Sequence, residues 1–174
     1  MAAPSPTLQV AATNQLALVK ISGRASFNCS VDFKKLVYGL QEEGHRCFVL
    51  DLTDCLILDS TFLGVLAGFA LKLTETPGEA GSITLLNPNQ RILDLLDNLG
   101  VGHLFRVIQG TDPLSGNCKE VSSPVHGATN MERSRVCLEA HEILTAINPA
   151  NIPKFKDVIR FIAEDLKRKE AKKR

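Results

Sequence analysis

An Asp-Ser-Thr sequence at residues 59–61 holds the side chains of this chain that are best placed for chemistry. A strand-like apolar run at 46–52 precedes it, and an apolar helix-like run at 61–74 follows. Ser60 is therefore predicted to lie where a helix begins. The first amides of a helix have no internal partners, and the helix dipole is positive there, so this position stabilises an anion. A phosphate on Ser60 would add about −1.5 to −2 of charge.

Ser60 and Asp59 each have a functional and a purely structural interpretation. Ser60 is interpreted as a phosphoacceptor, and the alternative is that its hydroxyl only caps the helix. Asp59 is interpreted as a group that positions Ser60 or contacts a partner. The alternative for Asp59 is a favourable interaction with the positive end of the helix.

The residues around Ser60 do not indicate an enzyme. A serine hydroxyl is a poor nucleophile without a base, and no Gly-x-Ser-x-Gly elbow surrounds this one. His45, His103, His126 and His141 show no sequence arrangement that identifies such a base. The chain also lacks a Gly-x-x-x-x-Gly-Lys nucleotide loop, so any phosphoryl donor must be bound by another protein.

The cysteines indicate reduced and mostly buried thiols rather than a metal or redox centre. They are odd in number and form no Cys-x-x-Cys pair: Cys29, Cys47, Cys55, Cys118 and Cys137. His141-Glu142 lacks the second histidine of a helical zinc motif. No metal or cofactor is predicted, and a reducing, cytoplasmic location is expected.

Composition excludes several classes of partner. The net charge of +1 gives no global attraction to nucleic acid or to an anionic membrane. The first six residues have neither a basic region nor an apolar core, so no signal peptide is expected. The apolar run 62–71 is too short for a membrane span. The basic tail 167–174 is interpreted as a solvated helix end, and the alternative is contact with nucleic acid or acidic lipid.

Residues 8–109 predict a small α/β domain in the order β-β-α-β-α-β-α-β. The expected strands are 8–11, 16–22, 46–52, 82–86 and 103–108, and the later ones are joined by helical crossovers and should be parallel. The first helix is predicted to begin at Asn28 or Ser30 and to stop at Gly44. The third is predicted to begin at Asn87-Pro88 and to end at Gly100.

Two further predictions concern packing. Gly64 and Gly68 lie one turn apart in the predicted helix 61–74, so this helix is expected to approach the sheet closely. Residues 129–174 predict two amphipathic helices, the first with a capping box at Thr129 and Glu132. Such a hairpin buries too little alone, so it should dock on the α/β domain, on another copy of the chain or on a partner.

The domain boundaries follow from these elements. Residues 1–110 form the predicted α/β domain, and 129–174 form the helical hairpin with its basic tail. Between them, residues 111–128 are rich in Pro, Gly, Ser and Thr and predict a linker or long exposed loop.

The turn and helix after residue 58 resemble the STAS family, the sulfate-transporter and anti-sigma-factor-antagonist domains. The family pattern is Asp-Ser-Ser/Thr-Gly-Leu/Ile-Gly/Ala, and this chain matches it at Asp59, Ser60, Thr61, Leu63 and Gly64. A phenylalanine stands at position 62, where the family has its first glycine. The resemblance covers about residues 8–109 and implies a small mixed sheet with helical crossovers; the helical hairpin is an addition to it.

The resemblance also implies a function. Members of the antagonist type bind an anti-sigma factor that is a serine kinase, and phosphate on the serine breaks the complex; a phosphatase is a further expected partner. Ser60 would then be the phosphoacceptor. The expected partner-binding residues are Asp59, Thr61, Phe62, Leu63 and Gly64. The alternative is a phosphorylation-independent STAS scaffold subunit of a transporter or stress-sensing assembly. Homo-oligomers through the C-terminal helices are also compatible with the sequence.

Overall fold

A computed structural model of the chain describes residues 6–114, 118–120 and 127–174. The segment 1–5, His126 and part of the predicted linker 111–128 lie outside these residues.

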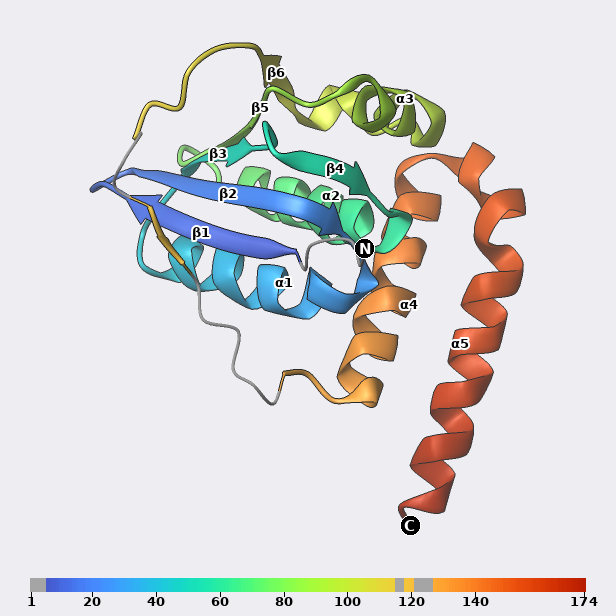
Figure 1. Cartoon of the computed structure of the whole chain (residues 1–174). Helices are drawn as coiled ribbons and strands as arrows, with labels where there is room; N and C mark the ends of the chain where they lie inside the picture. Colours follow the sequence, from blue (N-terminus) through green and yellow to red (C-terminus); the bar gives the residue numbers. More distant parts are fainter. Residues whose placement is uncertain (1–5, 115–117, 121–126) are drawn as a thin grey trace, which may run out of the picture.

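A mixed sheet forms the centre of the α/β domain (Figure 1). The strand order is β6-β5-β3-β2-β1-β7, and β4 pairs with the end of β2. β2, β3, β5 and β6 run parallel, whereas β1 and β7 are antiparallel additions at one edge. The strands are β1 Thr7–Ala12, β2 Leu16–Ala25, β3 Cys47–Asp51, β4 Cys55–Leu58, β5 Ser82–Leu86, β6 Arg106–Ile108 and β7 Lys119–Glu120. The predicted N-terminal hairpin and parallel crossovers are confirmed.

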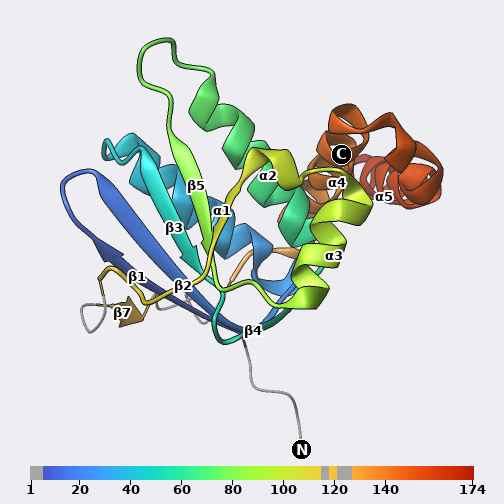
Figure 2. The same ribbon diagram turned by 90° about the horizontal axis from the view of Figure 1, so that it is seen from above.

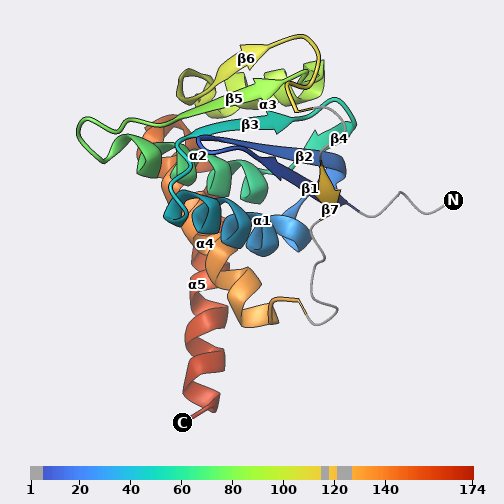
Figure 3. The same cartoon turned by 90° about the vertical axis from the view of Figure 1, so that its left-hand side faces the viewer.

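Two helices, α1 Phe27–Glu42 and α2 Ser60–Thr74, cover one face of the sheet (Figures 1 and 3). The main apolar core lies between them and the strands, because alternate residues of each strand point to this face. α2 is apolar around most of its circumference, and Figure 2 shows why: it lies between the sheet and a further layer formed by the C-terminal helices. α3 Gln90–Leu99 packs against β4 and against the 3-10 turn η1 Gly102–Leu104.

A smaller apolar cluster covers part of the opposite face of the sheet. Leu18, Val49 and Leu86 meet there, and Leu114 with Cys118 packs over them from the chain that follows β6. Within the predicted linker, β7 pairs with β1 at Gln9 and Val10.

The C-terminal helices form the predicted hairpin. α4 Asn130–Ile147 packs along α2 and α1, and α5 Ile152–Lys172 packs on the far side of α4, with the 3-10 turn η2 Pro149–Asn151 between them. The Thr129–Glu132 capping box at the start of α4 is confirmed. Figures 1 and 3 show α5 running past the α/β domain to the C-terminus.

Several predicted boundaries are wrong. α1 begins at Phe27 after the N-cap Ser26, which lies two to four residues before the predicted caps. The cap of α3 is Asn89, whose side chain accepts the Ile92 amide; Asn87 instead adopts a left-handed conformation with φ of 55°. The predicted strand 103–108 is divided into a 3-10 turn, η1 Gly102–Leu104, and β6. β4 has only four residues and ends two positions before α2 begins, so the sequence pattern does not reveal it as a strand.

The two glycines of α2 face α4 rather than the sheet, so the predicted reason for them is wrong. A Cβ at Gly64 would lie 2.4 Å from the backbone oxygen of Ala140, and a Cβ at Gly68 would lie 2.7 Å from the side chain of Ile143. The close approach that small residues permit is therefore made between two helices.

Candidate functional site

Ser60 is the first residue of α2, as predicted, and β4 places it there. β4 lies parallel to the end of β2, and the amide of Asp59 donates to the carbonyl of Ala25 at 2.9 Å. Asn89 supports β4 from the other side, because its side-chain nitrogen donates to the carbonyls of Cys55 and Leu56. The start of α2 is thus fixed against the ends of two parallel strands.

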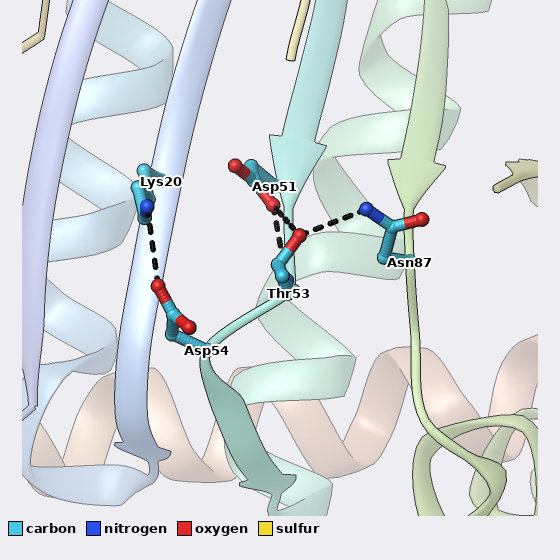
Figure 4. A network of polar contacts seen from close by, with 5 residues as sticks. All are labelled: Lys20, Asp51, Thr53, Asp54 and Asn87. Carbon is cyan, nitrogen blue, oxygen red and sulfur yellow. Dashed lines mark hydrogen bonds and ion pairs between the residues drawn. The ribbon is translucent and has the colours of Figure 1, made fainter. Parts of the chain in front are cut away.

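A polar network holds the connection between β3 and β4 (Figure 4). The buried carboxylate of Asp51 accepts from the amide and the hydroxyl of Thr53, and Asn87 donates to the same hydroxyl at 2.9 Å. Lys20 pairs with Asp54 at 3.1 Å. These contacts satisfy the polar groups of a tight turn. They keep β4, and with it Ser60, in a fixed place.

Asp59 caps two helices with one carboxylate. Oδ1 accepts the amide of Phe62 in α2 at 2.8 Å, and Oδ2 accepts the amide of Phe27, the first residue of α1, at 2.6 Å. The carboxylate therefore already fills the anion position that the two helix N-termini create. A phosphate on Ser60 would therefore lie next to this negative charge as well as next to the helix-start amides that the sequence predicts.

The hydroxyl of Ser60 contacts a histidine from the C-terminal hairpin. Its Oγ lies 2.9 Å from Nε2 of His141 in α4, while Nδ1 of His141 lies 2.7 Å from the carbonyl oxygen of Cys137. A carbonyl only accepts, so Nδ1 carries the proton, and in the neutral ring Nε2 accepts from the serine. The ring is 4% exposed and packs edge-on against Phe155, with centroids 4.8 Å apart. Ser60 itself stays partly exposed.

Four of the predicted partner-binding residues are buried within the chain. Phe62 and Leu63 are fully buried, Phe62 against Phe33 with ring centroids 4.4 Å apart. Thr61 is 4% exposed, and Gly64 lies under α4. The phenylalanine that replaces the family glycine thus fills the core between α1 and α2. In this arrangement only Ser60 and Asp59 of the motif reach the surface.

A buried thiol completes the contact between α2 and α4. Cys137 Sγ lies 3.3 Å from the hydroxyl of Thr61. Burial raises the pKa of the Cys137 thiol, and the hydrogen bond with Thr61 opposes this shift. All five cysteines are free, and Cys29 and Cys55 are also buried, as predicted; Cys47 is exposed.

His141, Ala140 and Cys137 belong to the site but were not assigned to it from the sequence. They share a face of α4 with Leu144, at spacings of three and four residues, and this face contacts α2. The signal available in the sequence was a histidine inside an apolar helical stripe. That signal does not say which serine the histidine will meet, because the two residues are separated by 81 positions.

Neither a metal centre nor a membrane helix is found in the part of the chain that the structure describes. Within residues 6–114, 118–120 and 127–174, no group of three His, Cys, Asp or Glu side chains is arranged to hold a metal ion. No described helix combines the length and apolarity needed to cross a bilayer.

The α/β domain is similar in fold to anti-sigma factor antagonists. SpoIIAA in its unphosphorylated form is 17% identical with a TM-score of 0.53; the match covers 60% of this chain and 89% of that one. Phosphorylated SpoIIAA from Bacillus is 17% identical with a TM-score of 0.50, and the match covers 60% of this chain and 92% of that one. A putative anti-sigma factor antagonist from Thermotoga maritima is 19% identical with a TM-score of 0.50, and the match covers 59% of this chain and 85% of that one.

Comparison with curated protein sequences finds no match. The family model of the STAS domain, by contrast, matches residues 7–113, which end before the helical hairpin begins and make up more than half of the chain. This chain belongs to the STAS domain family.

Proposed function

We propose that this chain is a regulatory protein of the anti-sigma factor antagonist type, which binds an anti-sigma factor with serine kinase activity and is switched by phosphorylation of Ser60. The observation that carries the proposal is the place of Ser60. It is the first residue of α2, it remains partly exposed, and it follows the Asp59 cap in an Asp-Ser-Thr order that resembles the family pattern. Asp59 is proposed to position the serine and, with it, to contact the partner.

The proposed chemistry is a phosphoryl transfer in which this chain supplies only the acceptor. The partner kinase binds a nucleoside triphosphate with its metal ion. A bond forms between Ser60 Oγ and the terminal phosphorus, the bond to the leaving oxygen breaks, and nucleoside diphosphate departs. The hydroxyl proton passes to a base of the kinase. A phosphatase reverses the modification by hydrolysis.

The physical basis of the switch is repulsion at an interface. A phosphate beside Asp59 concentrates negative charge on one small surface, and like charges facing each other across an interface cost several kcal/mol. A loss of about 3 kcal/mol already lowers the affinity by roughly a hundredfold. No change of fold is needed for the complex to separate.

The test combines detection of the phosphate with binding. Mass spectrometry of the protein from its native host should find phosphate on Ser60, and a pulldown with and without phosphatase treatment should identify the partner. In calorimetric titrations with that partner, Ser60→Ala should bind as wild type does and Ser60→Glu should lose affinity. Ser82→Glu is the matched control, since Ser82 is exposed at the opposite end of the parallel strands. Equal affinities for all three variants would rule out the switch.

A phosphorylation-independent scaffold is the second candidate. It is favoured by α4, which covers much of α2, and by the bond between Ser60 and His141, which restricts access to the hydroxyl. A native protein that carries no phosphate on Ser60 or Thr61 under any growth condition, yet copurifies with a stable assembly, would support this candidate.

A further inference from the structure

We propose that the hairpin of α4 and α5 is a lid over Ser60, and that the docked lid and a phosphate on Ser60 exclude each other. The inference rests on the proposed function in one respect, that Ser60 is the residue phosphorylated. It goes further by making the chain's own C-terminal helices the first element that responds to the phosphate.

The exclusion begins at one hydrogen bond. Ser60 Oγ and His141 Nε2 are 2.9 Å apart, so no space remains between them for a phosphorus atom and its oxygens. The imidazole has little freedom to retreat. Its other nitrogen is held by the carbonyl of Cys137 at 2.7 Å, and its buried ring is packed against Phe155 of α5.

The backbones of the two helices prevent a small adjustment. Gly64 of α2 is so close to Ala140 that even a methyl group at position 64 would lie 2.4 Å from the Ala140 oxygen. α4 therefore has no room to move toward α2. While the phosphoserine points at His141, space for the phosphate must come from movement of α4 away from α2.

Charge acts in the same direction. The carboxylate of Asp59 lies on the residue before Ser60 and is already bonded to the amides of Phe27 and Phe62. A phosphate would lie next to this carboxylate. Turning the phosphoserine away from His141 places the dianion in solvent, where it is hydrated, but this rotation breaks the Ser60–His141 bond and so removes one contact that holds the docked lid.

The hairpin lies outside the family domain, because the STAS match ends at residue 113. Ala140 and Leu144 of α4 join the main apolar core, whereas several other contacts of the hairpin with the domain are polar. The side chain of Asn151 donates to the carbonyl of Leu99 at the end of α3, and that of Lys154 to the carbonyl of Asn98. Lys34 of α1 pairs with Glu139 of α4. Hydrogen bonds of this kind are replaced by hydrogen bonds to water when a helix leaves, so each contributes little net stability to the docked state.

The cysteines provide a direct readout of lid opening. Cys137 is 8% exposed and is buried between α4 and α2, so it reports on the lid. Cys55 is 2% exposed in the core of the α/β domain and reports on global unfolding. Cys47 is exposed in the closed structure and reports on the activity of the reagent. Maleimide labelling followed by peptide mass spectrometry distinguishes the three thiols.

The experiment compares the full chain with serine and with phosphoserine installed at position 60 during translation. Phosphoserine at position 82 is the control for added charge. We expect phosphoserine at 60 to label Cys137 at least tenfold faster, a shift of about 1.4 kcal/mol in the opening equilibrium, with Cys55 still protected and Cys47 unchanged. An unchanged or slower Cys137 rate would overturn the proposal, because it would mean that the phosphate is accommodated beneath the lid or held by His141.

A second variant tests the mechanism even if opening is accompanied by partial unfolding. His141→Ala leaves a space where the ring was, so phosphoserine at 60 should accelerate Cys137 labelling much less in this background than in wild type. Equal acceleration in both backgrounds would remove His141 from the mechanism. These results are independent of whether a kinase or anti-sigma factor is found, so failure of the proposed function and failure of the lid are distinguishable.

Discussion

Replacing Gly64 by alanine tests how closely α4 is seated on α2. The new Cβ would lie 2.4 Å from the backbone oxygen of Ala140 and 2.7 Å from its Cβ. Alanine raises helix propensity by about 1 kcal/mol over glycine, whereas overpacking typically costs about 1–3 kcal/mol. Because the obstacle is backbone, the cost should lie near the upper end of that range. The propensity gain acts on the helicity of α2 in both the docked and the undocked state, so it does not offset this cost, and we expect the docking of α4 to weaken by at least about 1–2 kcal/mol.

Two other helical glycines, Gly39 and Gly68, provide matched controls for this prediction. Gly39, inside α1, has no atom within 4 Å of an added Cβ, so Gly39→Ala should stabilise the chain by up to about 1 kcal/mol. Gly68→Ala meets only the end of the Ile143 side chain, at 2.7 Å, and that methyl group can rotate aside. Its effect should lie between the other two.

The assay is maleimide labelling of Cys137, with urea unfolding as the measure of global stability. Gly64→Ala should label Cys137 roughly tenfold faster than wild type, since about 1.4 kcal/mol corresponds to a factor of ten. Gly39→Ala should label no faster than wild type. If Gly64→Ala and Gly39→Ala behave alike, the close contact between the helices does not govern docking, and the reasoning fails.

Three further predictions concern other contacts of the domain and the hairpin. Asp59→Ala leaves two helix-start amides without their acceptor, so the free energy of unfolding in urea should fall by about 2–4 kcal/mol. Asp59→Asn keeps one side-chain acceptor and should lose about half as much stability. Equal losses for the two variants would contradict the double cap. Asn151→Ala removes a fully buried amide that bonds two carbonyls, so amide exchange in α5 should accelerate by at least tenfold while that of β3 stays unchanged. Burial raises the pKa of the Cys55 thiol from about 9 to about 11, so the folded state keeps a proton that the unfolded chain loses. Stability should therefore decline as pH rises from about 9 to about 11, and Cys55→Ala should show a smaller decline in urea titrations across that range.

Local patterns correctly predicted most of the α/β domain and the start of the helical hairpin. The apolar runs of β3 and α2, the Gly100 stop of α3 and the Thr129 capping box each depend on residues close together in the chain. The Asn87-Pro88 start was misread because Asn89, two residues later, makes the cap and also donates to β4. That second role depends on a strand more than thirty residues away.

The surroundings of Ser60 were less predictable for a related reason. Ser60 and Asp59 could be identified from a short motif, but His141 comes from a helix outside the STAS match, and its contact depends on how α4 docks. Gly64 carried the relevant information, since it indicated a close approach. A spacing of small residues does not distinguish a sheet from a helix as the neighbour.

The carboxylate of Asp59 joins the beginnings of α1 and α2, and this has a mechanical consequence. A force that displaces the peptide around Ser60, whether from a bound protein or from an opening lid, must stretch the bonds to Phe27 and Phe62 together. A displacement at this one residue is therefore transmitted to the first turns of both α1 and α2. Changes at this serine should consequently be detectable in the amide resonance of Phe27, thirty-three residues earlier in the chain.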